Sequence, residues 1–176
     1  YLKIVKKYLK NKKIKKYRII LEPAKRNTAP AILVTSLIKD IPNKQPLVFF
    51  PSDHLIVNVD SFNKIINKNK AYLNNDNIFI FGVKPTVPSS AYGYFLTKKN
   101  KNNTNKVIKF IEKPSVTKAK KIIKKNAYWN SGILFSSKIS IINNFKKFEP
   151  TIYKNCIRAV LKAKLKNNTY YLYKSA

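Results

Sequence analysis

The chain has 176 residues, of which 44% are hydrophobic and 12% aromatic, and these values exclude a disordered tail and suit a folded globular domain. Lysine and arginine number 37 against 7 acidic residues, so the formal net charge is +30. A charge of that size raises the question of a polyanionic partner, such as nucleic acid or an anionic membrane.

The predicted elements alternate between helices and strands along the first half of the chain. Apolar residues at helical spacing predict helices, and short apolar runs rich in β-branched residues predict strands. The expected helices cover residues 2–16, 29–39, 60–75, 116–126 and 138–165, the last interrupted at Glu149-Pro150. The expected strands cover residues 17–21, 46–50, 77–83, 92–96, 106–111 and 132–136.

This alternation predicts an α/β fold with a mixed, mostly parallel sheet flanked by helices. The polar segment 98–106 is expected to be the tip of a hairpin, and Thr28 is expected to cap the helix that follows it. No linker-like stretch divides the sequence. Residues 1–176 are therefore expected to form one domain.

Four short polar segments follow predicted strands, where ligands bind in open α/β sheets. The first begins at Glu22, whose carboxylate could accept two hydrogen bonds from the ring N–H and the amine of guanine. Free N–H groups of the next helix would favour an anion or a carbonyl nearby. The spacing by itself favours an ordinary capped turn, with Glu22 and Arg26 in solvent, over this binding role.

The second segment is PSDH, residues 51–54, directly after the most apolar strand. Asp53 is a candidate ligand for Mg²⁺, which takes one or two carboxylates together with phosphate oxygens and water. A turn or helix-cap role for Asp53 remains open. His54 is the single histidine, and nothing in the sequence supplies the partners of a nucleophilic triad.

The third segment is FIEKP, where Glu112 could accept hydrogen bonds from sugar hydroxyls and Lys113 could neutralise a phosphate. The fourth is WNSG, where Asn130 offers both a donor and an acceptor. An exposed Glu–Lys ion pair and a turn anchored by Trp129 are the alternatives.

In this order, EPAKRNTAPA, PSDH, FIEKP and WNSG resemble the bacterial mannose-1-phosphate guanylyltransferases over residues 18–150. The segment KPTVPSSAYGYF also resembles the family, with Ser90-Ala91 in place of its usual Thr-Gly. The resemblance implies a Rossmann-like, GT-A-like nucleotidyltransferase domain. It also implies synthesis of GDP-mannose and pyrophosphate from GTP and mannose 1-phosphate with Mg²⁺.

The resemblance assigns a role to each matching residue. Asp53 and Lys113 become the catalytic residues, with Asp53 as the ligand of Mg²⁺ and Lys113 as the phosphate-binding lysine. Nucleotide binding falls to Glu22, Arg26, Asn27 and Thr28, and mannose binding to Gly93, Glu112 and Asn130.

The family's Gly-rich triphosphate loop and its second metal-binding Asp have no counterpart in these 176 residues. We therefore expect a fragment of the domain that is incomplete at both ends and does not catalyse GDP-mannose synthesis by itself. The resemblance leaves open a homo-oligomer in the full-length protein.

Two alternatives are another sugar-1-phosphate nucleotidyltransferase and a lysine-rich nucleic-acid-binding module. The second is not favoured, because the arginines are only Arg18, Arg26 and Arg158, whereas arginine leads in specific phosphate and base contacts. Abundant Lys, Asn and Ile are typical of an AT-biased genome. A single cysteine, Cys156, favours a reducing cytoplasm, and the run 31–38 is too short to span a bilayer, so no membrane partner is expected.

Overall fold

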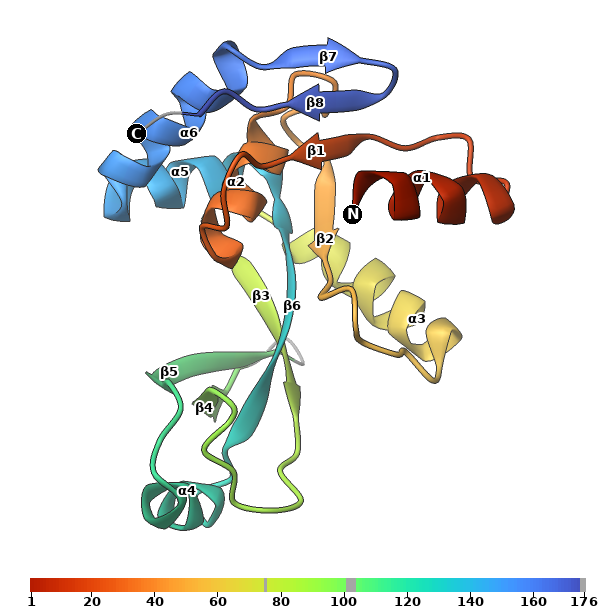
Figure 1. The fold of residues 1–176 in the computed structure, drawn as a ribbon. Coiled ribbons are helices and arrows are strands. Elements are labelled where there is room, and N and C mark those ends of the chain that lie inside the picture. The colour runs from red at the N-terminus through yellow and green to blue at the C-terminus, as the bar shows by residue number, and fades with distance from the viewer. Residues whose placement is uncertain (75, 101–103, 175–176) are drawn as a thin grey trace. The chain divides into compact units, whose positions relative to one another are not determined.

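A computed structural model describes residues 1–74, 76–100 and 104–174 (Figure 1). The helices are α1 (Leu2–Asn11), α2 (Thr28–Leu37), α3 (Val59–Asn69), the 3₁₀ turn η1 (Lys70–Tyr72), α4 (Val116–Ile123), α5 (Lys138–Phe148) and α6 (Pro150–Leu161). The strands are β1 (Ile19–Leu21), β2 (Pro46–Phe49), β3 (Ile78–Val83), β4 (Tyr94–Lys99), β5 (Asn105–Ile111), β6 (Tyr128–Ser137), β7 (Lys164–Lys166) and β8 (Thr169–Tyr171). The expected mixed α/β class is confirmed. The expectation of mostly parallel strands is not met, because β1–β8 is parallel but β3–β6, β4–β5, β4–β6 and β7–β8 are antiparallel.

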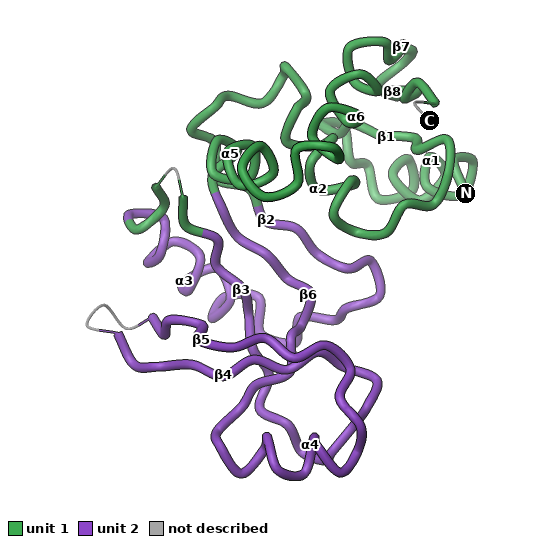
Figure 2. Tube along the Cα trace, turned by 90° about the vertical axis from the view of Figure 1, so that its left-hand side faces the viewer, with its two compact units in different colours: residues 1–47, 72–77, 137–176 green, residues 48–71, 78–136 purple. Residues whose placement is uncertain are grey.

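The chain forms two compact units (Figure 2). Unit 1 comprises residues 1–47, 72–77 and 137–176, and unit 2 comprises residues 48–71 and 78–136. Because the chain crosses between them several times, no single cut in the sequence separates the units. The expectation of one domain over residues 1–176 stays a prediction.

In unit 1, α2, α5 and α6 pack together beside a three-stranded sheet ordered β1-β8-β7. Leu33 and Val34 of α2 and Cys156 of α6 are buried against one another. β1 pairs in parallel with β8, so the C-terminal strand holds the strand that leads to Glu22. β1 therefore carries the first polar segment at the edge of this core.

The β7–β8 hairpin lies where the sequence predicts the end of a helix, at residue 165, and was not predicted. Its two-residue turn has Asn167 and Asn168 at φ 46° and 60°, and asparagine tolerates this left-handed conformation better than most residues. Lys164–Lys166 lacks the apolar alternation of a strand, and all three residues are exposed. Pairing with β8 decides its conformation.

Helix α1 ends at Asn11, five residues before the predicted end. Lys13 has a φ of 55°, which cannot continue a right-handed helix. The lysine-rich residues that follow contribute no apolar face to extend the packing. Within the described ranges, no helix combines the length and the apolar character needed to cross a membrane.

In unit 2, β6 pairs antiparallel with β3 and β4, and β4 pairs antiparallel with β5. The sheet order is β2-β6-β4-β5, with β3 also on β6. Helix α4 covers one face through Ala119 and Ile122, which pack with Tyr94 and Trp129. The expected hairpin between β4 and β5 is confirmed, and its tip at residues 101–103 lies outside the described residues.

β6 begins at Tyr128, four residues earlier than predicted. WNSG thus lies inside a strand, where Trp129 pairs with Tyr94 and Asn130 with Gly82. The sequence suggested a turn because Asn, Ser and Gly are frequent in turns. Pairing with strands on both sides overrides that local preference.

Candidate active site

In unit 2, the three predicted sugar-binding residues share one face of the sheet. Tyr94 is opposite Ile111 and Trp129 in the ladder, and these side chains face α4. Because side chains alternate along a strand, Gly93 and Asn130 belong to the other face. Asn130 donates its backbone N–H to the carbonyl of Gly93 at 2.8 Å, so the two residues are directly hydrogen-bonded.

Gly93 leaves room for the carboxylate of Glu112. A Cβ atom at residue 93 would lie 2.8 Å from Oε2 of Glu112 and 3.0 Å from the ring of Phe110, closer than van der Waals contact permits. Glu112 therefore lies over a backbone that has no side chain. A polyhydroxylated ligand approaching Gly93 would meet this carboxylate and the main chain together.

The side chain of Asn130 is oriented by its own strand. Its Oδ1 accepts the N–H of Gly132 at 3.1 Å, which leaves the amide N–H groups as its donors. Gly132 has a φ of 74° and its Cβ position is 3.2 Å from Pro51. The WNSG strand and the turn that carries Asp53 are thereby adjacent within unit 2.

Lys113 and Asp53 are both exposed at the ends of strands. Lys113 follows β5 and has a φ of 39°, so the backbone turns sharply between Glu112 and Pro114. Asp53 lies in the turn after β2, where His54 donates its N–H to the carbonyl of Pro51 at 3.5 Å. Unit 2 thus contains the predicted metal, phosphate and sugar residues.

In unit 1, Glu22 lines a pocket of about 280 Å³. The predicted nucleotide residue Arg26 also lines it. One wall is a face of α6, whose contributing residues follow helical spacing. The lining from α6 is Ile152, Asn155, Cys156 and Ala159, and the C-terminal segment adds Leu172, Tyr173 and Lys174.

The pocket residues of α6 were not predicted as site residues. In the sequence, Cys156 indicates only a reducing compartment, although the spacing of 152, 155, 156 and 159 marks one face of a helix. Burial, and next the charge of Glu22, raise the pKa of the Cys156 thiol. Burial likewise raises the pKa of Glu22 above its usual 4.5.

Asn27 and Thr28 begin α2, but not as predicted. The N-cap is Asn27, with a φ of 65°, and Thr28 is the first residue inside the helix. At this position the backbone N–H of Thr28 is one of the unpaired donors of the first turn. These donors favour a carbonyl or an anion at the start of α2.

A protein-family model described as Nucleotidyl transferase matches residues 2–173. The chain is a member of this family. A mannose-1-phosphate guanylyltransferase of Escherichia coli is 36% identical over 151 residues, which cover 81% of this chain and 32% of that protein. The member described here thus spans about a third of the length of the curated relatives it matches.

Two solved structures extend the comparison. One, described as mannose-6-phosphate isomerase from Helicobacter pylori, has a TM-score of 0.83 and 30% identity, covering 96% of this chain and 66% of that one. The other, described as mannose-1-phosphate geranyltransferase from Thermus thermophilus, has a TM-score of 0.72 and 25% identity. It covers 82% of this chain and 43% of that one. The fold of this nucleotidyl transferase chain is therefore shared with both.

The carboxylates of this family member suit a metal ion such as Mg²⁺, which substrate phosphates also coordinate, better than an ion bound by protein side chains alone. Within residues 1–74, 76–100 and 104–174, no three His, Cys, Asp or Glu side chains group closely enough to hold an ion. A single exposed carboxylate such as Asp53 is the type of protein ligand that Mg²⁺ combines with substrate phosphates and water.

The raised pKa of Glu22 predicts how stability depends on pH. Because the folded state disfavours the carboxylate, Glu22 costs stability once the pH exceeds 4.5, its usual pKa, and costs nothing below that value. We expect Glu22→Gln to be more stable than wild type at pH 7, and equally stable well below pH 4.5. Solvent contact of Glu22 keeps the difference small.

Thermal unfolding of both proteins from pH 3 to pH 8 measures this difference. Glu149→Gln is a suitable control, because Glu149 is exposed at the junction of α5 and α6. A Glu22→Gln protein less stable than wild type at pH 7 would show that the carboxylate makes a favourable contact in the fold.

Proposed function

We propose that this chain supplies the base- and sugar-recognition parts of an enzyme that makes GDP-mannose and pyrophosphate from GTP and mannose 1-phosphate. The observation that carries the proposal is the close approach of Glu112 to Gly93, with Asn130 bonded to the same glycine. Membership of the nucleotidyl transferase family, and relatives named mannose-1-phosphate guanylyltransferase, support it.

The reaction is an in-line phosphoryl substitution. An oxygen of the sugar phosphate forms a bond to the α-phosphorus of GTP, while the bond from that phosphorus to the bridging oxygen of the β-phosphate breaks. Pyrophosphate leaves with the bonding electrons. Such reactions are accelerated mainly by positioning and by neutralising charge, so the protein needs cations and oriented donors more than a nucleophile.

In unit 1, Glu22 accepts hydrogen bonds from the ring N–H and the exocyclic amine of guanine. Arg26 lines the same pocket and supplies a cation to the nucleotide. Asn27 and Thr28 present the backbone N–H groups at the start of α2 to an acceptor of the base or nucleotide. The carboxylate selects guanine, since adenine offers no equivalent pair of neighbouring donors.

In unit 2, Glu112 accepts from mannose hydroxyls and Asn130 donates its amide N–H groups to them, while Gly93 permits close approach to its backbone. Lys113, next to Glu112, pairs with the phosphate of mannose 1-phosphate. Asp53 is the ligand of Mg²⁺, which when bound neutralises phosphate charge and polarises the phosphorus centre.

The role of Lys113 predicts a selective loss of affinity. Charge-assisted hydrogen bonds contribute about 1.5–3 kcal/mol, so Lys113→Ala should weaken mannose 1-phosphate binding by about ten- to a hundredfold. GTP binding should change little. Isothermal titration of residues 1–176 with mannose 1-phosphate, glucose 1-phosphate, GTP and ATP measures this.

Lys109→Ala is the matched control, because Lys109 is an exposed lysine of β5 near the same end of the strand. It removes the same charge without removing the proposed phosphate contact. Equal losses in the two variants would mean that Lys113 acts only through the net charge. Tighter binding of glucose 1-phosphate or ATP than of the proposed substrates would favour another sugar-1-phosphate nucleotidyltransferase.

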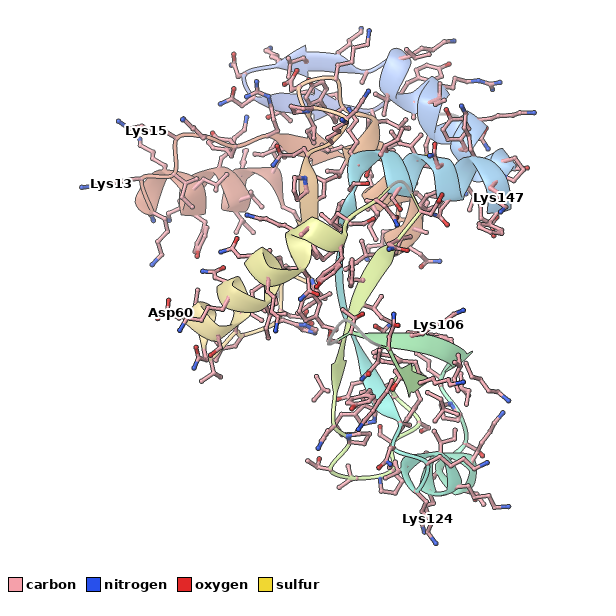
Figure 3. All side chains as sticks on the ribbon, turned by 180° about the vertical axis from the view of Figure 1, so that it is seen from behind. Lys13, Lys15, Asp60, Lys106, Lys124 and Lys147 are labelled. Carbon is pink, nitrogen blue, oxygen red and sulfur yellow. The ribbon has the colours of Figure 1, made fainter. Side chains whose placement is uncertain are left out.

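The excess of lysine supports a solvated surface more than a nucleic-acid site. The labelled Lys106 and Lys124 of unit 2 extend outward, as do Lys147 of α5 and the pair Lys13 and Lys15, which follow α1 in unit 1 (Figure 3). Binding to a duplex oligonucleotide should therefore be weak and should fall steeply as salt rises. Oligonucleotide binding that is sequence-specific and resistant to salt would overturn this view.

A further inference from the structure

The ring and the hydroxyl of Tyr94 lie in different environments. Its ring is fully buried between the sheet of unit 2 and α4, in contact with Ala119 and Ile122. Its hydroxyl reaches out of this core to the loop that precedes β4. There it accepts the N–H of Ser89 at 3.0 Å and donates to the carbonyl of Ser89 at 2.9 Å.

One hydroxyl therefore satisfies both backbone groups of a residue five positions earlier. The side chain of Ser89 adds a second tie, because its Oγ accepts the N–H of Ala91 at 3.1 Å. Tyr92 then packs on Trp129, with ring centroids 4.9 Å apart. The loop is therefore held by contacts at Ser89, Ala91 and Tyr92, up to Gly93.

The fastened loop ends at the candidate sugar site. Gly93 is bonded to Asn130 and lies under Glu112, on the face of the sheet opposite the Tyr94 ring. The hydroxyl of Tyr94 is thus on the other side of the backbone from any sugar bound there. It can act on a ligand only by fixing where the backbone of residues 89–93 lies.

We infer that Tyr94 is a positioning residue for sugar-phosphate recognition, acting through the loop of Ser89 to Tyr92. The inference rests on the proposed function of the Gly93, Glu112 and Asn130 site. A loop that is already ordered does not have to be ordered when the ligand binds, and this lowers the cost of binding. Without the hydroxyl, the N–H and the carbonyl of Ser89 lose their hydrogen-bond partner and bond to water instead.

The variant Tyr94→Phe keeps the ring and removes only the hydroxyl. If it leaves the binding-competent loop populated about one tenth of the time, the dissociation constant for mannose 1-phosphate rises about tenfold. GTP affinity should not change. Hydrogen exchange of the Ser89 amide should accelerate in the free protein, because this amide has lost its acceptor.

Tyr92→Phe is the matched control, since it removes a hydroxyl from the exposed neighbour on the same loop and should preserve both the Ser89 protection and the affinity. Ser89→Ala cuts only the tie to Ala91 and lies outside the core, so it should fold even if Tyr94→Phe does not. We expect it to weaken mannose 1-phosphate binding severalfold.

Titration of wild type and the three variants with mannose 1-phosphate and GTP, together with amide exchange, separates the outcomes. Wild type that binds no mannose 1-phosphate overturns the proposed function and this inference with it. Wild type that binds, with Tyr94→Phe binding equally well, overturns the inference alone. If Tyr94→Phe is unfolded, unchanged affinity in Ser89→Ala overturns it instead.

Discussion

Replacing Gly93 with alanine is expected to weaken mannose 1-phosphate binding by about ten- to a hundredfold, the value of a lost charge-assisted hydrogen bond. The added methyl group would lie 2.8 Å from Oε2 of Glu112 and 3.0 Å from the Phe110 ring. The ring belongs to a half-exposed side chain, and Glu112 is exposed, so both can move aside. The fold should survive while the carboxylate leaves its place.

A double-mutant cycle tests whether Gly93→Ala acts through Glu112. In a Glu112→Ala background the displaced carboxylate is already gone, so adding Gly93→Ala should cost little further affinity. Calorimetric titration of the wild type, the two single variants and the double variant provides the coupling energy. Fully additive losses would show that the methyl group blocks the ligand directly, with no part played by Glu112.

Replacing Lys138 with methionine is expected to lower the free energy of unfolding by about 1–3 kcal/mol, because buried acceptors lose their donor. Lys138 is only 5% exposed. Its Nζ donates to the carbonyl of Ile38 at 3.0 Å and to that of Ile41 at 2.6 Å. These carbonyls follow the C-terminus of α2, where a cation is also favoured by the helix dipole.

Denaturant unfolding at pH 7 measures the loss, with Lys154→Met as the control at an exposed lysine of α6. Burial lowers the pKa of Lys138 below its usual 10.5, so the folded state releases this proton before the unfolded state does. Wild-type stability should therefore gain from this group as pH rises toward 10.5, which the variant cannot do. Two proteins of equal stability at pH 7 would mean that the Lys138 bonds contribute nothing net.

Local sequence determined the helices and strands that have strong patterns. Capping signals predicted α2, lysine-rich or amphipathic patterns predicted α4 and α3, and short apolar runs predicted β1 to β3. Asn167 and Asn168 are residues typical of a turn. The short, lysine-rich β7 beside them lacks the alternation of apolar and polar residues that predicts a strand. Its strand conformation depends on pairing with β8, which in turn pairs with β1 from about 150 residues earlier.

The sequence by itself also determined which polar residues are candidates, because motif order and strand ends are local properties. That Glu112 lies over Gly93 follows from the register in which Tyr94 is opposite Ile111, and a register is a relation between strands. From sequence alone a lysine is expected to be solvated. Lys138 is nevertheless buried, because the carbonyls of Ile38 and Ile41 both accept hydrogen bonds from its Nζ. Cys156 of α6 and Glu22 likewise line one pocket only through tertiary packing. These contacts join residues far apart in the chain, so only the tertiary structure decides them.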